Sequence, residues 1–527
     1  MAVGISSKGL VARGLDGSGK WTRRGTVDSR PTITGDIVVF TAAEKLVALD
    51  GATGRELWSS PVADKRLRGA GDDGHTTVAS LESPSGGGSL LVAIDRTGRV
   101  VQKWTPEPDI GVPAVVGNVV FVPWGNQYVS ALDAGSGREV GRVLARTVMS
   151  RAVSLGGSLY FGESALVKFD DAIVKASRNE AHVIKLPERE LPGKPVWFPD
   201  GTRALPTEAG APDSIRYYGR PAGGPDIGLD SGRFAATYFR IAIGFDARDA
   251  ATRWAATFPV EIVGGDATVG GFAFCDADGV VHLVRARAGE AAGRVELGEQ
   301  VRACVVSGGG FEMKGGADAG TLPEQITRAV ELRESQMATI QRFLLRELGT
   351  NEDPTVTKTL VDVASDARTG GEILEEARSL LASRRNGAEY MLEALQRHYD
   401  FLSDVLRSPP VGPMADALAA MGEKRAAPLL AEHLNDPSDT PNDVRRAAHA
   451  LVTLATAAEL AAVRTFFALY RSTADDDDLV ASVIDAAKVI VDVGGADGRE
   501  IVQRAAEDPL THPGIKEGIS ALLPKGG

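Results

Sequence analysis

The sequence predicts two domains of different fold class: an N-terminal domain of repeated four-stranded β-sheets, followed by an all-α domain. Three observations support this prediction. A strand, a turn and a tryptophan recur as one motif through roughly the first 300 residues, which indicates a repeat architecture. Glycine clusters follow at residues 308–310 and 315–320. From Pro323 onward, apolar residues recur with helical spacing.

The clearest copy of the motif is LVALDGATGRELW, from Leu46 to Trp58. Its first four residues are typical of a buried strand. Asp50 ends the strand, and the next residues supply a side-chain acceptor and two glycines for a tight turn. The chain then returns along a second strand that carries Trp58. One hairpin cannot bury a tryptophan by itself, so neighbouring copies are expected to cover it.

Two further copies are clear, YVSALDAGSGREVGRV at 128–143 and IAIGFDARDAATRW at 241–254. The shared positions are Ala48, Asp50, Thr53, Gly54 and Trp58 in the first copy, Ala131, Asp133, Ser136 and Gly137 in the second, and Asp246 and Trp254 in the third. Weaker copies place the anchor position at 16, 95, 170 and about 289, and most gaps are 34 to 45 residues.

Each period also holds two apolar runs upstream of the motif, as at 31–40 and 113–122, which are typical of a β-hairpin. Four short strands per period are the content of one β-propeller blade. Seven blades are preferred, but the 76 residues between Asp170 and Asp246 leave room for an eighth near residue 208. The proline-rich stretch at 188–213 is interpreted as an inserted loop, either a binding element or a passive insertion. Residues 301–306 are expected to complete the first blade and tie the domain's ends together.

The pattern Ala48-x-Asp50-x-x-Thr53-Gly54-x-x-x-Trp58 resembles the repeat signature of the pyrroloquinoline-quinone-like β-propellers, in which the tryptophan docks between adjacent blades. The resemblance covers roughly residues 1–312. This family includes quinoprotein dehydrogenases, the bacterial outer-membrane assembly factor BamB and propeller domains attached to bacterial kinases. A BamB-like protein would lie in the bacterial periplasm or at the periphery of the outer membrane, as a lipoprotein whose export segment and lipid anchor precede this chain. A cytoplasmic location is the alternative.

Residues 313–322 are interpreted as a flexible glycine-rich join between a β domain at 1–312 and a helical domain at 323–527. Helix starts are indicated at Asp353-Pro354, at Thr440-Pro441 and at the acidic run 475–478, and helix pairs are expected at 414–435, 443–472 and 479–507. The segment 426–454 has a proline in its first helix, an Asn-Asp-Pro turn and a second helix opening with Asp-Val-Arg. It resembles HEAT-type repeats, which implies an α-solenoid over about 413–507.

The net charge of −12 is concentrated in the helical domain, where residues 321–527 carry 33 acidic and 22 basic side chains. This balance argues against nucleic acid as a partner, and it fits either a basic protein surface or a solvated acidic face. Short basic pairs such as Arg384-Arg385 are typical of solvated turns. No stretch reaches the roughly 18 consecutive apolar residues of a membrane helix.

The sequence contains no recognisable catalytic, cofactor or metal site. Quinoprotein dehydrogenases typically carry an adjacent cysteine pair, whereas Cys275 and Cys304 are far apart here and are expected to be buried free thiols. The seven histidines show no zinc-ligand spacing, and His433 and His449, on consecutive predicted helices, are interpreted as surface histidines.

These observations predict a non-enzymatic, BamB-like scaffold or adaptor without a cofactor. Propeller loops and a solenoid groove would bind other proteins, as part of a bacterial cell-envelope or outer-membrane assembly complex. Two alternatives from other classes are a quinone-dependent oxidoreductase and a propeller that senses a small ligand.

Overall fold

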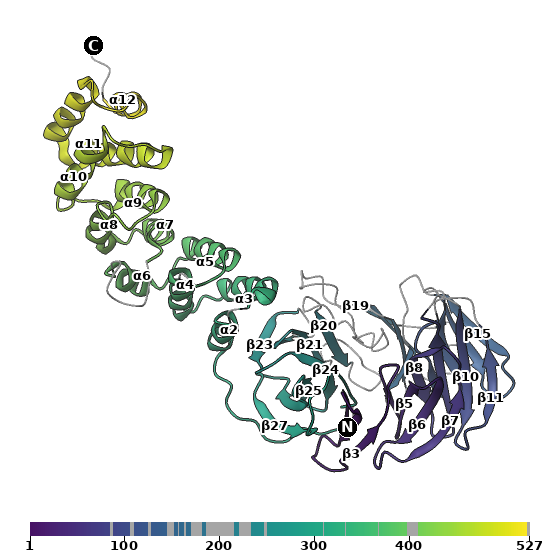
Figure 1. Ribbon diagram of the computed structural model, residues 1–527. Helices are drawn as coiled ribbons and strands as arrows, with labels where there is room; N and C mark the ends of the chain where they lie inside the picture. The colour runs from purple at the N-terminus through teal and green to yellow at the C-terminus, as the bar shows by residue number, and fades with distance from the viewer. Residues whose placement is uncertain are drawn as a thin grey trace. The chain divides into compact units, whose positions relative to one another are not determined.

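The computed structural model describes the chain in segments: residues 1–84, 88–105, 110–124, 128–144, 152–155, 158–162, 165–169, 182–185, 215–220, 233–246, 250–308, 310–332, 334–366, 368–397 and 409–523. The chain divides into two compact units, residues 1–325 and 326–527. Figure 1 shows strands throughout the first unit and helices throughout the second. The predicted insertion at 188–213, the anchor at 170 and the space for an eighth blade near 208 lie outside the described residues.

In the first unit, the described strands form seven antiparallel sheets of four strands each. The first sheet consists of β28 (Ala303–Val306), β1 (Ala2–Ser6), β2 (Gly9–Arg13) and β3 (Trp21–Arg24), the second of β4 (Thr32–Thr34), β5 (Ile37–Ala42), β6 (Lys45–Asp50) and β7 (Glu56–Pro61), and the third of β8 (Arg66–Asp72), β9 (Thr76–Glu82), β10 (Ser89–Asp95) and β11 (Val100–Trp104). The fourth sheet consists of β12 (Ala114–Val116), β13 (Val119–Trp124), β14 (Tyr128–Asp133) and β15 (Glu139–Leu144), and the fifth of β16 (Ala152–Leu155), β17 (Ser158–Gly162), β18 (Ala165–Phe169) and β19 (His182–Lys185). The sixth consists of β20 (Arg216–Arg220), β21 (Arg233–Tyr238), β22 (Ile241–Phe245) and β23 (Thr252–Thr257), and the seventh of β24 (Ile262–Thr268), β25 (Gly271–Asp276), β26 (Val280–Arg285) and β27 (Ala291–Glu296).

One sheet takes strands from both ends of the β unit. β1 pairs with β28, with Val3 opposite Val305, and the Met1 ammonium group donates a hydrogen bond to the Ser307 carbonyl oxygen at 2.8 Å. The pairing predicted for residues 301–306 is therefore present. Unfolding either end of the unit would break this sheet, so the two ends stabilise each other.

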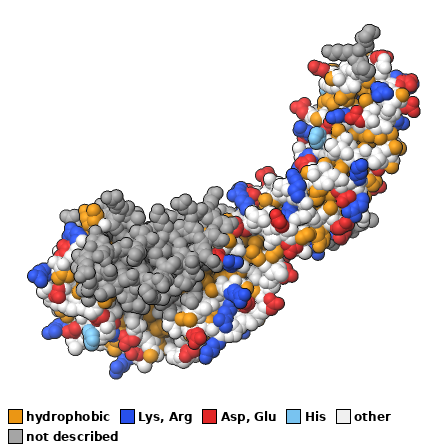
Figure 2. Space-filling view, turned by 180° about the vertical axis from the view of Figure 1, so that it is seen from behind, with side chains coloured by type: hydrophobic (Ala, Val, Ile, Leu, Met, Phe, Trp, Pro, Cys, Tyr) orange, Lys and Arg blue, Asp and Glu red, His pale blue; other side chains and the backbone are white. Residues whose placement is uncertain are grey.

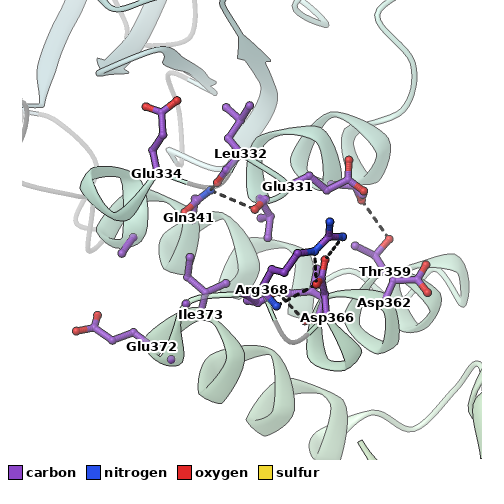
Figure 3. A pocket seen from close by; sticks show the side chains of 17 residues that line it. Glu331, Leu332, Glu334, Gln341, Thr359, Asp362, Asp366, Arg368, Glu372 and Ile373 are labelled. Atoms are coloured by element: carbon purple, nitrogen blue, oxygen red, sulfur yellow. Dashed lines mark hydrogen bonds and ion pairs between the residues drawn. The ribbon is translucent and has the colours of Figure 1, made fainter. Parts of the chain in front are cut away.

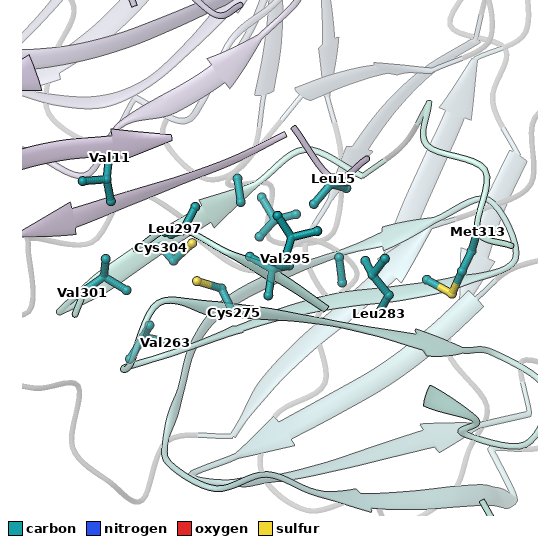
Figure 4. Packing of buried hydrophobic residues seen from close by; sticks show 14 residues of the cluster. Val11, Leu15, Val263, Cys275, Leu283, Val295, Leu297, Val301, Cys304 and Met313 are labelled. Carbon is teal, nitrogen blue, oxygen red and sulfur yellow. The ribbon is translucent and has the colours of Figure 1, made fainter. Parts of the chain in front are cut away.

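Among the described residues, six pairs of these sheets are neighbours through their first strands. β4 lies beside β8, β8 beside β12, β12 beside β16, β20 beside β24, β24 beside β28, and β28 beside β4. Apolar side chains fill the space between neighbouring sheets, and Figure 4 shows one such cluster, in which side chains of β2, β25, β26, β27 and β28 pack together. Cys275 and Cys304 belong to this cluster, and both are buried free thiols.

The second unit consists of short helices joined by turns. The helices are α2 (Leu322–Val330), which starts within the first unit, η2 (Ser335–Met337), α3 (Ala338–Gly349), α4 (Thr355–Ser365), α5 (Gly371–Ser383), α6 (Ala388–Leu395), α7 (Val411–Met421), η3 (Lys424–Ala426), α8 (Ala427–His433), α9 (Pro441–Leu454), α10 (Leu460–Tyr470), α11 (Asp477–Glu507) and α12 (Pro513–Ser520). α9 packs against both α7 and α11. No helix among the described residues is long and apolar enough to cross a membrane.

The helix starts follow the capping residues that the sequence indicated. Thr440 caps α9, because its hydroxyl accepts the Asp443 amide at 3.2 Å, and Asp476 caps α11 by accepting the Leu479 amide at 2.8 Å. The acidic run 475–478 thus contains a helix cap. α11 is interrupted at Gly495, whose φ of 60° and ψ of −129° are not helical, so the segment 479–507 consists of two helical pieces.

The segment interpreted as a flexible join lies along the β unit for part of its length. Met313 is buried in the cluster of Figure 4, and the Ala317 amide donates to the Ala291 carbonyl at 2.9 Å. The Gln325 side chain accepts the Ala255 amide and donates to the Ala288 carbonyl, both at 2.9 Å. These bonds attach the start of α2 to the β unit.

Candidate functional site

The predicted motif residues form hydrogen-bonded turns between the third and fourth strands of their sheets. In the first copy, Asp50 Oδ1 accepts the Thr53 amide at 2.8 Å and the Thr53 hydroxyl at 2.6 Å. In the second, Asp133 Oδ1 accepts the Ser136 amide and hydroxyl, both at 2.7 Å. These hydrogen bonds lower the pKa of both carboxyl groups, since they favour the charged form. Each aspartate therefore holds its turn closed at neutral pH.

The glycines of the motif allow both the turn and a close contact with the preceding sheet. Gly54 and Gly137 have φ values of 70° and 71°, in the left-handed region that glycine adopts without strain. A Cβ on Gly54 would lie 2.5 Å from the Trp21 ring, and one on Gly137 would lie 1.8 Å from the Gln102 amide. In the third copy, Ala250 holds this position at a φ of 56°, and the Asp246 carboxylate pairs with Arg253.

The tryptophans reach from the fourth strand of one sheet to the turn of the next. Trp21 Nε1 donates to the Gly51 carbonyl at 2.8 Å, Trp104 Nε1 to Gly137 at 2.9 Å, and Trp254 Nε1 to Ala286 at 2.9 Å. Trp58 packs against Gly98 in the same way, but its Nε1 has no hydrogen-bond partner among the described residues. Ala48 lies opposite Trp58 and Gly244 opposite Trp254, so a small residue makes room for each of these two indoles. These side chains connect neighbouring sheets.

A cavity of about 790 Å³ opens where the first strands of several sheets meet. Its wall includes residues from β4, β8 and β12, each of which is an edge strand of its sheet. Edge strands present unpaired main-chain N–H and C=O groups, which can pair with an extended segment of another chain. The sequence did not indicate this cavity, because its wall is assembled from residues between 33 and 310.

The polar side chains at this cavity centre on Arg96. Its guanidinium contacts Asp72 at 2.6 Å and Asp36 at 2.8 Å, and so joins the turns of two sheets. The Asp72 side chain is fully buried, and burial raises its pKa, although hydrogen bonds from Thr77 and Gly74 and the charge of Arg96 act in the opposite direction. With Asp36, Asp72 and Asp73 against the single Arg96, the charged lining is mainly acidic.

A second polar cluster lies in the helical unit around His433, which is buried and not a surface histidine as predicted. His433 Nδ1 contacts Asp439 Oδ2 at 2.8 Å, and Nε2 contacts the Leu395 carbonyl oxygen at 2.9 Å. Both ring nitrogens thus face acceptors, which suits the doubly protonated imidazolium. Burial acts to lower the pKa of His433, but the bond to Asp439 and the nearby charges outweigh it, and the pKa is raised. The predicted surface position is correct for His449, whose side chain is 75% exposed.

His433, Asp436 and Asp439 are also close enough to hold a metal ion, because their donor atoms lie within 4.8 Å of one another. The histidine, however, already directs both ring nitrogens at protein oxygens. A buried imidazolium–carboxylate pair accounts for this geometry without an ion. The spacing His-x-x-Asp-x-x-Asp is the signal in the sequence that would have shown this cluster.

Comparison with known proteins gives one consistent similarity for the β unit. Residues 9–80 and 44–180 match the family described as outer membrane protein assembly factor BamB. The outer membrane protein assembly factor BamB of Bordetella pertussis (strain Tohama I) is 31% identical over 112 residues, which are 21% of this chain. The chain spans only 28% of the length of that relative. The repeats of the β unit are therefore similar in sequence to those of BamB.

Two solved structures were also matched. BamB from Moraxella catarrhalis is 17% identical, with a TM-score of 0.30 over 55% of this chain and 84% of that one. Hsv2 from Kluyvelomyces marxianus is 9% identical, with a TM-score of 0.31 over 49% of this chain and 73% of that one. The seven described four-stranded sheets and the helices that follow them fit a β-propeller joined to a helical domain.

Proposed function

We propose that this chain is a non-enzymatic scaffold whose β unit binds partner proteins in the assembly of outer-membrane proteins. The observation that carries the proposal is the sequence similarity of residues 9–180 to BamB, whose name describes an assembly factor. We propose a structural role for the motif residues Ala48, Asp50, Thr53, Gly54, Trp58, Ala131, Asp133, Ser136, Gly137, Asp246 and Trp254. Hydrogen bonds within the turns and from the Trp254 indole, and the strand pairing around Ala48 and Ala131, support this role. The proposed location is the periplasmic side of the outer membrane.

In the proposed architecture, the seven sheets are the blades of one closed ring at residues 1–312, and the helical unit is a HEAT-like solenoid at about 413–507. Two observations support the ring. β1 pairs with β28, and the first strands of neighbouring sheets lie beside each other. The packing of α9 between α7 and α11 and the Asn-Asp-Pro turn before α9 support the solenoid. Solenoids of this kind present extended surfaces that suit protein partners.

The cavity lined by β4, β8 and β12 is the proposed site for an extended segment of a partner. Its edge strands offer main-chain hydrogen bonds, and the contacts of Arg96 with Asp36 and Asp72 hold its rim in place. An unfolded or partly folded β-barrel chain has the free strand edges that such a site would bind.

A photo-crosslinking amino acid in the full chain tests this proposal. It would replace His75, an exposed residue that follows the cavity-lining Gly74, and in a control protein Lys103, an exposed residue on the fourth strand of the same sheet. After irradiation in envelope preparations, crosslinks from position 75 to outer-membrane β-barrel or assembly proteins, and few from 103, are expected. Equal crosslinking from both positions would indicate non-specific contact and overturn the proposal. A quinone absorbance of the purified protein would overturn it in favour of the oxidoreductase.

A further inference from the structure

The helical unit contains a cavity of about 680 Å³ between α2, α3, α4 and α5. Its wall combines apolar side chains with an excess of carboxylates. The apolar part comprises Val330, Leu332, Ala338, Val363 and Ile373, and the charged residues are Glu331, Glu334, Asp362, Asp366, Glu372 and Arg368. Figure 3 shows these side chains around one space.

Two of the carboxylates are already paired. Asp366 makes a bidentate contact with Arg368, with both N–O distances at 3.0 Å, and Glu372 contacts Arg342 at 3.1 Å. For Glu331 and Asp362, no hydrogen bond or ion pair of the carboxylate occurs among the described residues. These two groups leave negative charge at the cavity that the lining Arg368 cannot balance, because Arg368 is held by Asp366.

The buried Gln341 gives an independent indication of a ligand. Its Nε2 donates to the carbonyl oxygens of Ala329 and Val330 at 3.0 and 3.1 Å, and to Leu332, which fixes the orientation of the amide. Its Oε1 is then a buried acceptor with no hydrogen-bond partner in the described part of the chain. A buried acceptor without a donor is unfavourable, and Gln341 lines the cavity, so a donor bound beside its amide would stabilise this arrangement.

We propose that this cavity binds a cationic group on an aliphatic stem, an ammonium or guanidinium. The stem would lie against Val330, Val363 and Ile373, the cation would contact Glu331 and Asp362, and a further N–H would satisfy Gln341 Oε1. Lysine or arginine side chains of a partner protein and free polyamines share this chemistry. The acidic balance of the unit would steer either ligand toward it.

This site extends the proposed scaffold function by naming the chemistry of one ligand, but it depends on the helical unit alone. Failure to bind a cation here would leave crosslinking from position 75 unchanged, and failure of that crosslinking would leave this cavity unaffected. The two proposals are therefore separable.

Calorimetric titration of the full chain tests the site with two probes, spermidine and an acetylated tri-lysine amide. In the double variant E331Q/D362N, affinity for the bound probe is expected to fall about tenfold or more, since charge-assisted hydrogen bonds are lost. The matched control E375Q/E517Q removes two charges from exposed positions of the same unit that do not line the cavity. Its affinity should change less than about twofold, since solvent screens exposed charges that do not contact the ligand.

The probes separate the two sources of ligand. Binding of the peptide but not of spermidine assigns the cavity to a protein partner, and the reverse assigns it to a free polyamine. A tri-lysine peptide with acetylated side chains has no cations and should not bind. If neither cationic probe binds, or if E331Q/D362N and E375Q/E517Q weaken binding equally, the proposal is wrong.

Discussion

The tryptophans between sheets allow a comparison of two nearly identical side chains that differ in one hydrogen bond. Trp254 and Trp58 occupy the same motif position and are both buried, with relative exposures of 0% and 4%. Trp254 Nε1 donates to the Ala286 carbonyl at 2.9 Å, whereas Trp58 Nε1 has no partner among the described residues. We therefore expect Trp254→Phe to destabilise the β unit more than Trp58→Phe.

The expected difference follows from the separate contributions. Both changes remove part of an indole from a packed interface, which costs on the order of 1–2 kcal/mol through the cavity left behind. Trp254→Phe also deletes a hydrogen bond and leaves the half-buried Ala286 carbonyl unpaired, which adds about 1–2 kcal/mol. Trp58→Phe removes a donor that is already unsatisfied, and this offsets part of its cavity cost. The two variants should differ by about 2 kcal/mol.

Urea unfolding of the full chain, followed by far-ultraviolet circular dichroism, measures this difference in the transition of the β unit. With an m value of about 3 kcal/mol per M, 2 kcal/mol corresponds to a midpoint shift of roughly 0.7 M. Trp21→Phe serves as a further control, because Trp21 donates to the Gly51 carbonyl and should behave like Trp254. Equal midpoints for Trp58→Phe and Trp254→Phe would refute the assignment of the hydrogen bond as the source of the difference.

Three further predictions concern a turn, an ion pair and a thiol. Gly54→Ala places a Cβ 2.5 Å from the Trp21 ring at a φ of 70°, and should cost about 3 kcal/mol in urea unfolding. Gly117→Ala, with a φ of 57° and open space around the Cβ, should cost only about 1 kcal/mol, and equal costs would contradict the steric argument. The pKa of His433 is raised in the folded state, so its stabilising contribution is complete below the unfolded pKa of about 6.5 and is lost as the pH rises through the folded pKa. The fall in Tm between pH 6 and pH 9 should therefore be smaller in Asp439→Asn, and an unchanged fall would count against the ion pair. Burial raises the pKa of the cysteine thiol in β25, so it should react with iodoacetamide only after denaturation, and rapid labelling of the native protein would show that the cluster opens.

The parts of the structure that the sequence could predict depend on local interactions. Asp50, Thr53 and Gly54 lie within one turn, so their residue types and spacing were enough to indicate the turn and the strands on either side. The helix starts at Thr440 and Asp476 were visible for the same reason, since a cap bonds to an amide three residues away.

The parts that the sequence missed depend on distant partners. Arg384 was interpreted as part of a solvated basic turn, which is wrong: it is 6% exposed and donates to the Asn351 carbonyl at 2.7 Å and the Asp353 carbonyl at 3.1 Å. Residue types near Arg384 gave no sign of these acceptors, which lie more than thirty residues earlier in the chain. Both cavities were invisible for the same reason, because each has a wall assembled from several strands or helices.

The contact between the first and last sheets shows how this β unit departs from its own repeat. Gly293 of β27 lies opposite Leu283 of β26, at the position where Trp254 lies opposite Gly244 in the preceding sheet. Instead of an indole, the Arg13 side chain spans this contact, donating to the Glu296 carbonyl at 3.0 Å and to the Gly17 carbonyl at 2.8 Å.

A tryptophan is dispensable at this contact because the chain connects the two sheets in other ways. β28 follows β27 along the chain and pairs directly with β1, so main-chain hydrogen bonds hold the first sheet to the end of the β unit. At four of the other contacts, a tryptophan of β3, β7, β11 or β23 reaches the next sheet. On the face in Figure 2, acidic and basic side chains are interspersed over the helical unit, whereas the charged lining of both cavities is mainly acidic. Negative charge is thus concentrated at the two cavities, whereas the repeated motif residues hold neighbouring sheets together.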